Sequence, residues 1–365
     1  MTNYNFSAGP GVLPTPVLTK IKNEFIKNEF THMSIIEISH RSTQFEEIIN
    51  SAEERLRDLM NISDDYGVAF IQGGGSTQFE MLPLNFANNK NRIAVLDSGN
   101  FASKAAQAAV TIGKQATILD SSKVDHYHHL PMLSTDFNAD EYDYLHLTTN
   151  NTIEGATYHQ SILPKTVGRL TADMSSNILA EPYDVNDFDA IFAGAQKNLG
   201  PAGVTVAIVK KDWLKEQNIE NVGSMLRYQN YLDKHSMYNT PPVFSIYALN
   251  LVLEWVQEQG GVDSMYAQNI EKSSKLYDYL DNSTFYHALV DESARSLTNV
   301  VFTTADLERD QAIAKDATKE GLFNLSGHRS VGGFRASLYN AQPIEAVDAL
   351  ITFLKKAENN YNDKH

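Results

Sequence analysis

Short apolar runs alternate with segments of helical character along the sequence, and this alternation most constrains the fold. Between and after the first two runs, residues 76–89 and 101–113 have helical spacing or a high alanine content. Strands joined through helices pair in parallel, and nearly all-apolar strands are typical of a sheet covered on both faces. We therefore predict an α/β fold around a mostly parallel sheet. The runs of strand type are residues 66–72, 92–97, 143–149, 168–173, 189–195 and 203–210.

The pattern changes after Pro241 and Pro242. Two long helices are expected, and the first ends at a pair of glycines. Two strands, each followed by a helix, complete a smaller α+β unit, in the order 243–261, 262–282, 299–304, 307–320, 334–339 and from 343 onward. A chain of 365 residues is long enough for two domains. We predict a large domain at 15–258 and a small domain at 259–365 that includes the N-terminal segment 1–14, with a first helix near 17–30.

Composition limits the possible chemistry. The chain has no cysteine, so disulfides, thiolate metal ligands and sulfur nucleophiles are excluded. A formal net charge of -15 disfavours binding to nucleic acid or to an anionic membrane. No apolar run approaches the ~20 residues that span a bilayer, and the first residues lack the pattern of a secretory signal. We expect a cytoplasmic protein, in which an anionic substrate would need a local group of Arg and His side chains.

A glycine-rich turn follows the first predicted strand in "QGGGSTQFE", residues 72–80. Glycines let backbone amides approach an anion, and a helix that starts at Ser76 would add unpaired N–H donors, so the turn predicts a phosphate site. A flexible strand-to-helix turn explains the residues equally well. The sequence meets neither G-x-x-x-x-G-K-[ST] nor G-x-G-x-x-G, and the absence of the second motif disfavours a nicotinamide-dependent dehydrogenase.

Asp173 and Lys197 each follow a predicted strand, where open α/β sheets place ligand-binding groups. A helix-capping aspartate and a surface lysine are the ordinary alternatives. Together with the glycine turn, however, the pair matches the needs of pyridoxal 5'-phosphate (PLP). A lysine holds the PLP aldehyde as a Schiff base, a carboxylate keeps the pyridine nitrogen protonated, and the glycine turn holds the phosphate.

Eight motifs in sequence order resemble the phosphoserine aminotransferases. These enzymes are PLP-dependent class V aminotransferases with the aspartate-aminotransferase fold, known as fold type I. The resemblance extends from about Asn5 to the last predicted helix. The motifs are "NFSAGPGVLP", "SHRS", "GGGSTQF", "NNTIEG", "ADMSSNI", "GAQKNLGPAGVTVAIV", "NTPPVFSIY" and "GHRSVGGFRASLYNA".

The resemblance implies that Lys197 forms the Schiff base with PLP and that Asp173 pairs with the pyridine nitrogen. The other cofactor positions of the family fall on Gly75, Ser76, Phe101, Thr152, Gln196, Asn239 and Thr240. The last two would reach the phosphate from the neighbouring subunit, which implies a homodimer with shared active sites. Two positions depart from the family. Phe101 replaces a tryptophan that commonly stacks on the ring, and Ser76 stands where many members carry arginine.

Substrate positions follow from the same resemblance. Arg335 would bind the α-carboxylate, and four other residues would surround the phosphate of one substrate or the distal carboxylate of glutamate. Those four are His40, Arg41, His328 and Arg329. Arg forks match either oxyanion, although any one His-Arg pair alone is also typical of a surface turn. "HYHHL", residues 126–130, reads as a polar loop, and we expect no metal site.

The implied reaction is reversible amino transfer in serine biosynthesis, converting O-phospho-L-serine and 2-oxoglutarate into 3-phosphooxypyruvate and L-glutamate. The family also suggests a side role on 4-phosphooxy-L-threonine in vitamin B6 synthesis. An alanine-glyoxylate or serine-pyruvate aminotransferase is an alternative, but it would leave the second His-Arg cluster unused. A cysteine desulfurase would need the thiol that this chain lacks. A catalytically silent PLP-fold binding protein is a further alternative.

Overall fold

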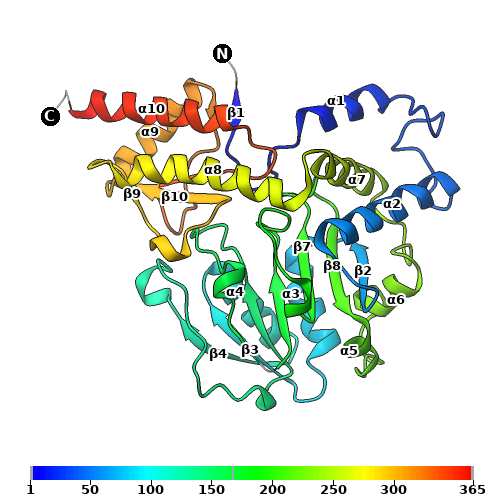
Figure 1. The fold of residues 1–365 in the computed structure, drawn as a ribbon. Helices are drawn as coiled ribbons and strands as arrows, with labels where there is room; N and C mark the ends of the chain where they lie inside the picture. The colour runs from blue at the N-terminus through cyan, green and yellow to red at the C-terminus, as the bar shows by residue number, and fades with distance from the viewer. Residues whose placement is uncertain (1–2, 167, 363–365) are drawn as a thin grey trace.

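A computed structural model describes residues 3–166 and 168–362. In this part of the chain, seven strands form the main sheet in the order β2-β8-β7-β6-β5-β3-β4 (Figure 1). All neighbours pair in parallel except β8, which is antiparallel to β2 and β7. The predicted mostly parallel sheet is thereby confirmed. The strands are β2 (Tyr66–Ile71), β3 (Arg92–Asp97), β4 (Gln115–Ser121), β5 (Tyr144–Thr148), β6 (Leu170–Asp173), β7 (Ala190–Gly194) and β8 (Thr205–Lys210).

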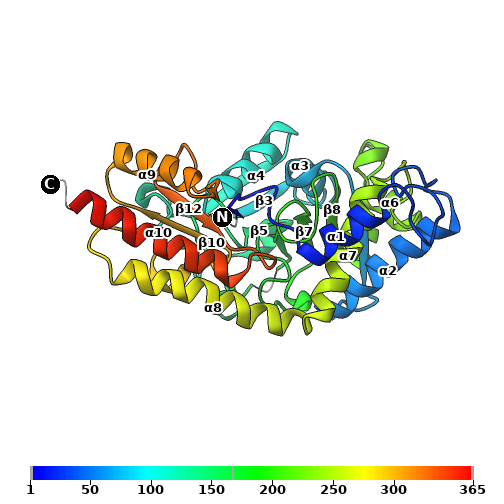
Figure 2. The same ribbon diagram turned by 90° about the horizontal axis from the view of Figure 1, so that it is seen from above.

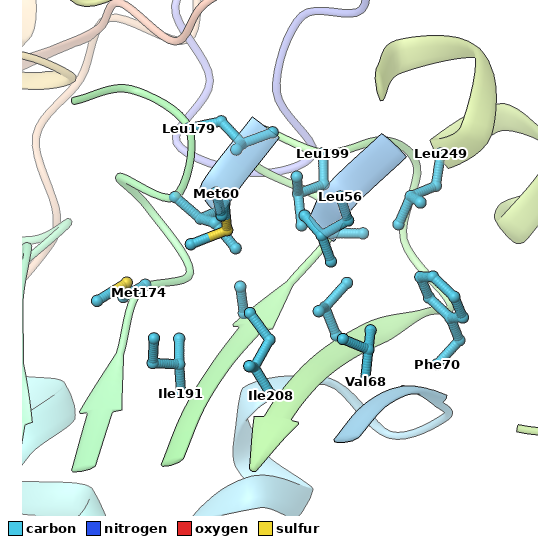
Figure 3. Close-up of a cluster of buried hydrophobic side chains, with 14 of the residues drawn as sticks. Leu56, Met60, Val68, Phe70, Met174, Leu179, Ile191, Leu199, Ile208 and Leu249 are labelled. Atoms are coloured by element: carbon cyan, nitrogen blue, oxygen red, sulfur yellow. The ribbon is translucent and has the colours of Figure 1, made fainter. Parts of the chain in front are cut away.

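Helices cover both faces of this sheet, and alternate residues of a strand enter different cores. Val68 and Phe70 of β2 pack with α2 (Thr43–Met60) and α7 (Val243–Glu258). Figure 3 shows Val68 below Leu56 of α2, and Phe70 below Leu249 of α7. Ala69 and Ile71 belong to the opposite core, together with residues of the helices α3 (Gly74–Phe86), α4 (Asn100–Thr111), α5 (Lys211–Lys215) and α6 (Tyr228–Asp233).

A separate hydrophobic core lies in the C-terminal part of the chain. Phe6 belongs to this core, and β1 (Tyr4–Asn5) pairs with β11 (Leu322–Phe323), so the N-terminal segment packs on the C-terminal part. Figure 2 shows α8 and α10 side by side. The predicted domain boundary at 258/259 stays a prediction. The ends of the predicted small domain, residues 1–2 and 363–365, lie outside the described ranges. The remaining elements are α8 (Gly261–Asp281), α9 (Leu307–Lys319), α10 (Ile344–Asn362), and an antiparallel sheet of β9 (His287–Ala288), β10 (Asn299–Thr303) and β12 (Phe334–Ser337).

The first helix is shorter than predicted. α1 spans Thr15–Glu24, whereas the sequence suggested a helix near 17–30. Beyond it, the side-chain oxygen of Asn28 accepts hydrogen bonds from the N–H groups of Phe30 and Thr31. An asparagine that binds the following backbone favours a turn over a continued helix. Single-turn helices occur at residues 123–125, 139–141, 160–162, 185–187, 224–226 and 292–294.

No helix within the described ranges is both long enough and apolar enough to cross a membrane.

Candidate active site

Asp173 and Lys197 lie at the carboxyl-terminal edge of the main sheet. Asp173 is the last residue of β6 and pairs with Phe192 of β7. Lys197 lies in the turn between β7 and β8. The Asp173 side chain is 6% exposed, and its Oδ1 accepts the backbone N–H of Ser175 at 2.9 Å. The carboxylate therefore faces a protein interior, where its charge acts strongly on nearby groups.

The Lys197 amine is held by Thr152 and faces an aromatic ring. Nζ donates to Thr152 Oγ1 at 2.7 Å and lies 5.1 Å from the centroid of the Phe101 ring. Burial lowers the pKa of Lys197 to about 8; the charge of Asp173 opposes this effect and that of Arg335 adds to it. An amine with this pKa is partly neutral near pH 7, as a nucleophile or a general base must be.

The glycine turn opens toward the residues after Asp173. α3 begins at Gly74, and its N-cap is Gly73 at φ 108°, so no side chain caps the first N–H groups. A Cβ added at Gly75 would lie 3.8 Å from Ser175 Oγ. Ser76 is exposed at the same helix start. Uncapped N–H donors at a helix N-terminus suit a phosphate group.

The backbone around Lys197 is packed against the N-terminal segment. The Gly11 N–H donates to the carbonyl of Gln196 at 2.7 Å. A Cβ added at Gly11 would lie only 2.6 Å from the carbonyl oxygen of Lys197, so this close approach requires glycine. The side chain of Gln196 lies beside Gly194 and Gly9. The "SAGPG" motif therefore supports the lysine turn directly.

His146 of β5 is close to Asp173, and sequence reasoning did not identify it. Its Nδ1 lies 3.0 Å from Thr171 Oγ1, and its ring is parallel to that of Phe192. Burial lowers the pKa of His146 to about 4 against the opposing charge of Asp173, so the ring is neutral at pH 7. The only sequence signal is a histidine inside the apolar run "DYLHLTT".

Three of the predicted substrate residues form one cationic group with Lys104. Burial lowers the pKa of His328, and the charges of Arg335, Arg329 and Lys104 add to this effect. Arg335 Nη1 donates to the carbonyl of Thr152 at 3.4 Å, whereas its buried Nε has no partner among the described residues. The sequence did not predict Lys104, whose amine lies 5.2 Å from the Phe101 ring centroid. The cationic group consists of Lys104, Arg329 and Arg335, with the His328 ring among them as a further hydrogen-bonding side chain, and it is suited to bind an anion.

Four other predicted residues lie together in a different place. His40, Arg41, Asn239 and Thr240 line a cavity of about 420 Å³. Within residues 3–166 and 168–362, no hydrogen bond or ion pair joins them to Lys197 or to the cationic group. Gln72, the residue just before the glycine turn, donates from its side chain to the carbonyl of Thr240 at 2.7 Å. This bond links the cavity to the start of the glycine turn. One chain therefore presents two separate sets of predicted site residues.

Glu154 is a further buried acid near the site. Its Oε1 accepts the N–H of Asn100 at 3.0 Å, and its Oε2 has no partner in the described part of the chain. Burial raises the pKa of Glu154 to about 7, the charge of Asp97 adds to this effect, and hydrogen bonds to the carboxylate and the charge of Arg335 oppose it. Glu154 lies inside the "NNTIEG" motif, but no pattern in the sequence indicates that it is buried.

In the loop of residues 126–130, His129 Nδ1 lies 2.9 Å from Asp125 Oδ2. Across the described residues, no group of three or more His, Asp or Glu side chains is placed to hold a metal ion. The expectation that no metal takes part stays a prediction.

The sequence matches the family described as "Aminotransferase class-V" over residues 3–350. It is 51% identical to a phosphoserine aminotransferase of Lactiplantibacillus plantarum, over 98% of this chain and 99% of that protein. The solved phosphoserine aminotransferase from Bacillus circulans subsp. alkalophilus is similar at 43% identity and a TM-score of 0.94, over 99% of both chains. PLP-bound phosphoserine aminotransferase from Trichomonas vaginalis is similar at 34% identity and a TM-score of 0.92, over 97% of this chain and 100% of that chain. The predicted fold class is confirmed.

Proposed function

We propose a reaction from the family of this chain, which belongs to the class-V aminotransferases and, within them, to the phosphoserine aminotransferases. The chain would convert O-phospho-L-serine and 2-oxoglutarate reversibly into 3-phosphooxypyruvate and L-glutamate. One observation in the site carries this proposal. Thr152 contacts both the Lys197 amine and the Arg335 guanidinium. An amine with a lowered pKa and an anion-binding group are thus held beside each other, as an amino acid substrate requires.

The residues present fit PLP. Lys197 offers an amine that is partly neutral, Asp173 a buried carboxylate, and the glycine turn a set of uncapped N–H donors. We assign Lys197 to the aldehyde, Asp173 to the pyridine nitrogen, and Gly75 and Ser76 to the phosphate. Phe101, Thr152 and Gln196 complete the contacts from this chain. When bound, PLP supplies an electron-withdrawing ring that stabilises negative charge developing at the substrate Cα.

The remaining chemistry belongs to the side chains. As a free amine, Lys197 Nζ would take the proton from the substrate Cα and later return a proton as general acid. Because its pKa is lowered to about 8, Lys197 can act both as general base and as general acid near neutral pH. Arg335, whose buried Nε lacks an acceptor within the described residues, binds the α-carboxylate and so turns the Cα–H bond toward Lys197. His328 and Arg329 bind the phosphate or the distal carboxylate.

We further propose a homodimer in which His40, Arg41, Asn239 and Thr240 serve the active site of the partner subunit. Their separation from Lys197 within one chain supports this arrangement. The segment between α1 and α2 also exposes apolar side chains that a second subunit would cover, since Ile26 is 81% exposed and Ile36 is 55% exposed. The cytoplasmic location and the side role in vitamin B6 synthesis stay predictions.

Comparing amino donors tests the function. Purified protein supplied with PLP should transaminate O-phospho-L-serine with 2-oxoglutarate far faster than it transaminates L-alanine with glyoxylate. Lys197→Ala should abolish activity with either pair, because the amine is needed both to hold PLP and to move the proton. Borohydride reduction followed by peptide mapping should place the pyridoxyl label on Lys197. A preference for alanine would favour the alanine-glyoxylate type, and full activity of Lys197→Ala would contradict the proposed mechanism.

A further inference from the structure

Lys272 is a buried lysine outside the site described above, and burial lowers its pKa to about 7. It lies on α8, is 3% exposed, and makes no ion pair with any carboxylate of the described residues. Its Nζ instead donates to backbone carbonyls of Tyr339 at 2.9 Å, Gln342 at 3.1 Å and Leu338 at 3.2 Å, and Asn340 O lies 3.5 Å away. Burying an ammonium group is costly, so its placement among converging carbonyls needs a reason.

Those carbonyls belong to the turn 338–342, which directly follows β12, the strand that carries Arg335. Within this turn, the Asn340 N–H donates to Asn198 Oδ1 at 2.9 Å. Asn198 is the residue after Lys197, and its Nδ2 donates to the carbonyl of Ile178 at 2.6 Å. The turn therefore connects the end of the Arg335 strand to the lysine turn.

Asn269, one helical turn before Lys272, ties in a third segment. Its Nδ2 donates to Asn340 Oδ1 at 2.7 Å and to the carbonyl of Ala180 at 2.9 Å. Asn340 Nδ2 in turn donates to the carbonyl of Leu179 at 2.8 Å. Residues 178–180 follow the strand that ends in Asp173. The segments that follow Asp173 and Arg335 and the turn that holds Lys197 thus meet at one buried point, the Asn340 junction (Asn198, Asn269, Lys272 and Asn340).

We propose that Lys272 is a positioning residue, which fixes the turn 338–342 and thereby the place of Arg335 relative to Lys197. The Lys272 Nζ donors satisfy the carbonyls of Leu338 and Gln342, which accept no other hydrogen bond from the described residues. They also add a bond to the Tyr339 carbonyl, which already accepts the N–H of Gln342. An apolar side chain could fill the same space but would leave the Leu338 and Gln342 carbonyls without a donor among the described residues. The turn would then rearrange, and Arg335 would move with the strand that precedes it. This inference rests on the proposed function only in one respect, because its test measures the KM for O-phospho-L-serine.

The test compares Lys272→Met with Lys275→Met. Lys275 lies on the same helix and pairs with Asp348 of α10, so the control makes the same substitution without touching the turn. For Lys272→Met we expect the KM for O-phospho-L-serine to rise about tenfold or more, because one misplaced anchor weakens substrate binding. The Kd for PLP, titrated without substrate, should change less than twofold, because Asn198 keeps its bond to Ile178. Lys275→Met should match the wild type in both quantities.

A second variant keeps the test decisive if Lys272→Met does not fold. Asn269→Ala removes the bonds to Asn340 and Ala180 without removing a charge, and it should raise the same KM with the same small effect on the Kd for PLP. A lower melting temperature with an unchanged KM in folded Lys272→Met or Asn269→Ala would overturn the proposal, since it would leave a purely structural role. A wild-type protein that binds PLP on Lys197 but ignores phosphoserine would instead contradict the proposed function.

Discussion

Lys197 and Arg335 meet at Thr152, which accepts a hydrogen bond from the lysine amine through its side chain and one from the guanidinium through its carbonyl. The two cations are therefore held close together, and the charge of Arg335 helps to lower the pKa of Lys197. In the proposed mechanism, a substrate carboxylate bound to Arg335 would offset this repulsion and place the substrate Cα near the amine. Thr152 thus joins the proposed carboxylate-binding group to the proposed proton-transferring amine.

The pH dependence of PLP attachment should report the lowered pKa of Lys197. Attachment to the PLP-free protein requires the neutral amine, so its rate should rise with pH and level off above about 8, where an ordinary lysine would continue to gain reactivity to about 10.5. Stopped-flow absorbance measures the rate. In Asp173→Asn the midpoint should move to lower pH, because the carboxylate that raises the Lys197 pKa is gone. A wild-type midpoint near 10 would contradict this account.

Arg335→Lys should raise the KM for O-phospho-L-serine by about 10 to 100-fold. A lysine cannot present the planar fork that binds a carboxylate with two parallel bonds. The melting temperature should change little, because the guanidinium makes only the long bond from Nη1 to the Thr152 carbonyl at 3.4 Å, and Nε has no partner among the described residues. Steady-state kinetics and thermal unfolding check both points. Arg309→Lys, on the surface of α9, is the matched control, and an equal rise in its KM would count against a specific role of Arg335.

Glu154→Gln should stabilise the protein at alkaline pH. Burial raises the folded-state pKa of Glu154 to about 7 from its ordinary value of 4.5. Between these values the folded state holds a proton that the unfolded state releases, so its contribution to stability falls as pH rises through this window. Glutamine does not titrate, and the variant should gain up to about 3 kcal/mol over the wild type between pH 4.5 and pH 8.

Thermal unfolding of the PLP-free proteins at pH 5 and pH 8 measures this difference. The control is Glu308→Gln, because Glu308 is exposed on α9. A gain that is the same at both pH values would show that packing, and not ionisation, separates Glu154→Gln from the wild type.

Mixing two inactive variants tests the shared site. A hybrid dimer of Lys197→Ala and Arg41→Ala subunits would contain one site with both native residues and one site with neither. Random mixing makes half of the dimers hybrid, so about a quarter of wild-type activity should return. Co-expression with two affinity tags isolates the hybrids. If purified hybrids are as inactive as the parent variants, Arg41 does not serve the partner subunit.

Most of the main sheet could be predicted because its strands are buried on both faces. The predicted run 92–97 coincides with β3, and 189–195 exceeds β7 by one residue at each end. β4 was missed because it is an edge strand in which no residue is fully buried, so "QATILDS" shows no continuous apolar run. Local hydrophobicity identifies a strand only where both of its faces are buried and its residues are therefore apolar.

Site residues could be predicted where a charged side chain directly follows a buried strand, since few structural roles other than ligand binding favour that position. Asp173 and Lys197 stood out for that reason. Lys272 did not, because a lysine in a helix normally faces water, and its partners here are main-chain carbonyls that no sequence pattern reveals. Glu154 and His146 were missed for a related reason, since their burial depends on contacts between distant segments.

The reversed direction of β8 gives Lys197 a particular mechanical setting. Both arms of its turn are anchored in neighbouring central strands, and the Gly11 contact closes the third side. The main chain at Lys197 is therefore held in place on three sides. The amine can still move by rotation about the single bonds of its side chain, so in the proposed mechanism Lys197 would change partners while its main chain stays in place.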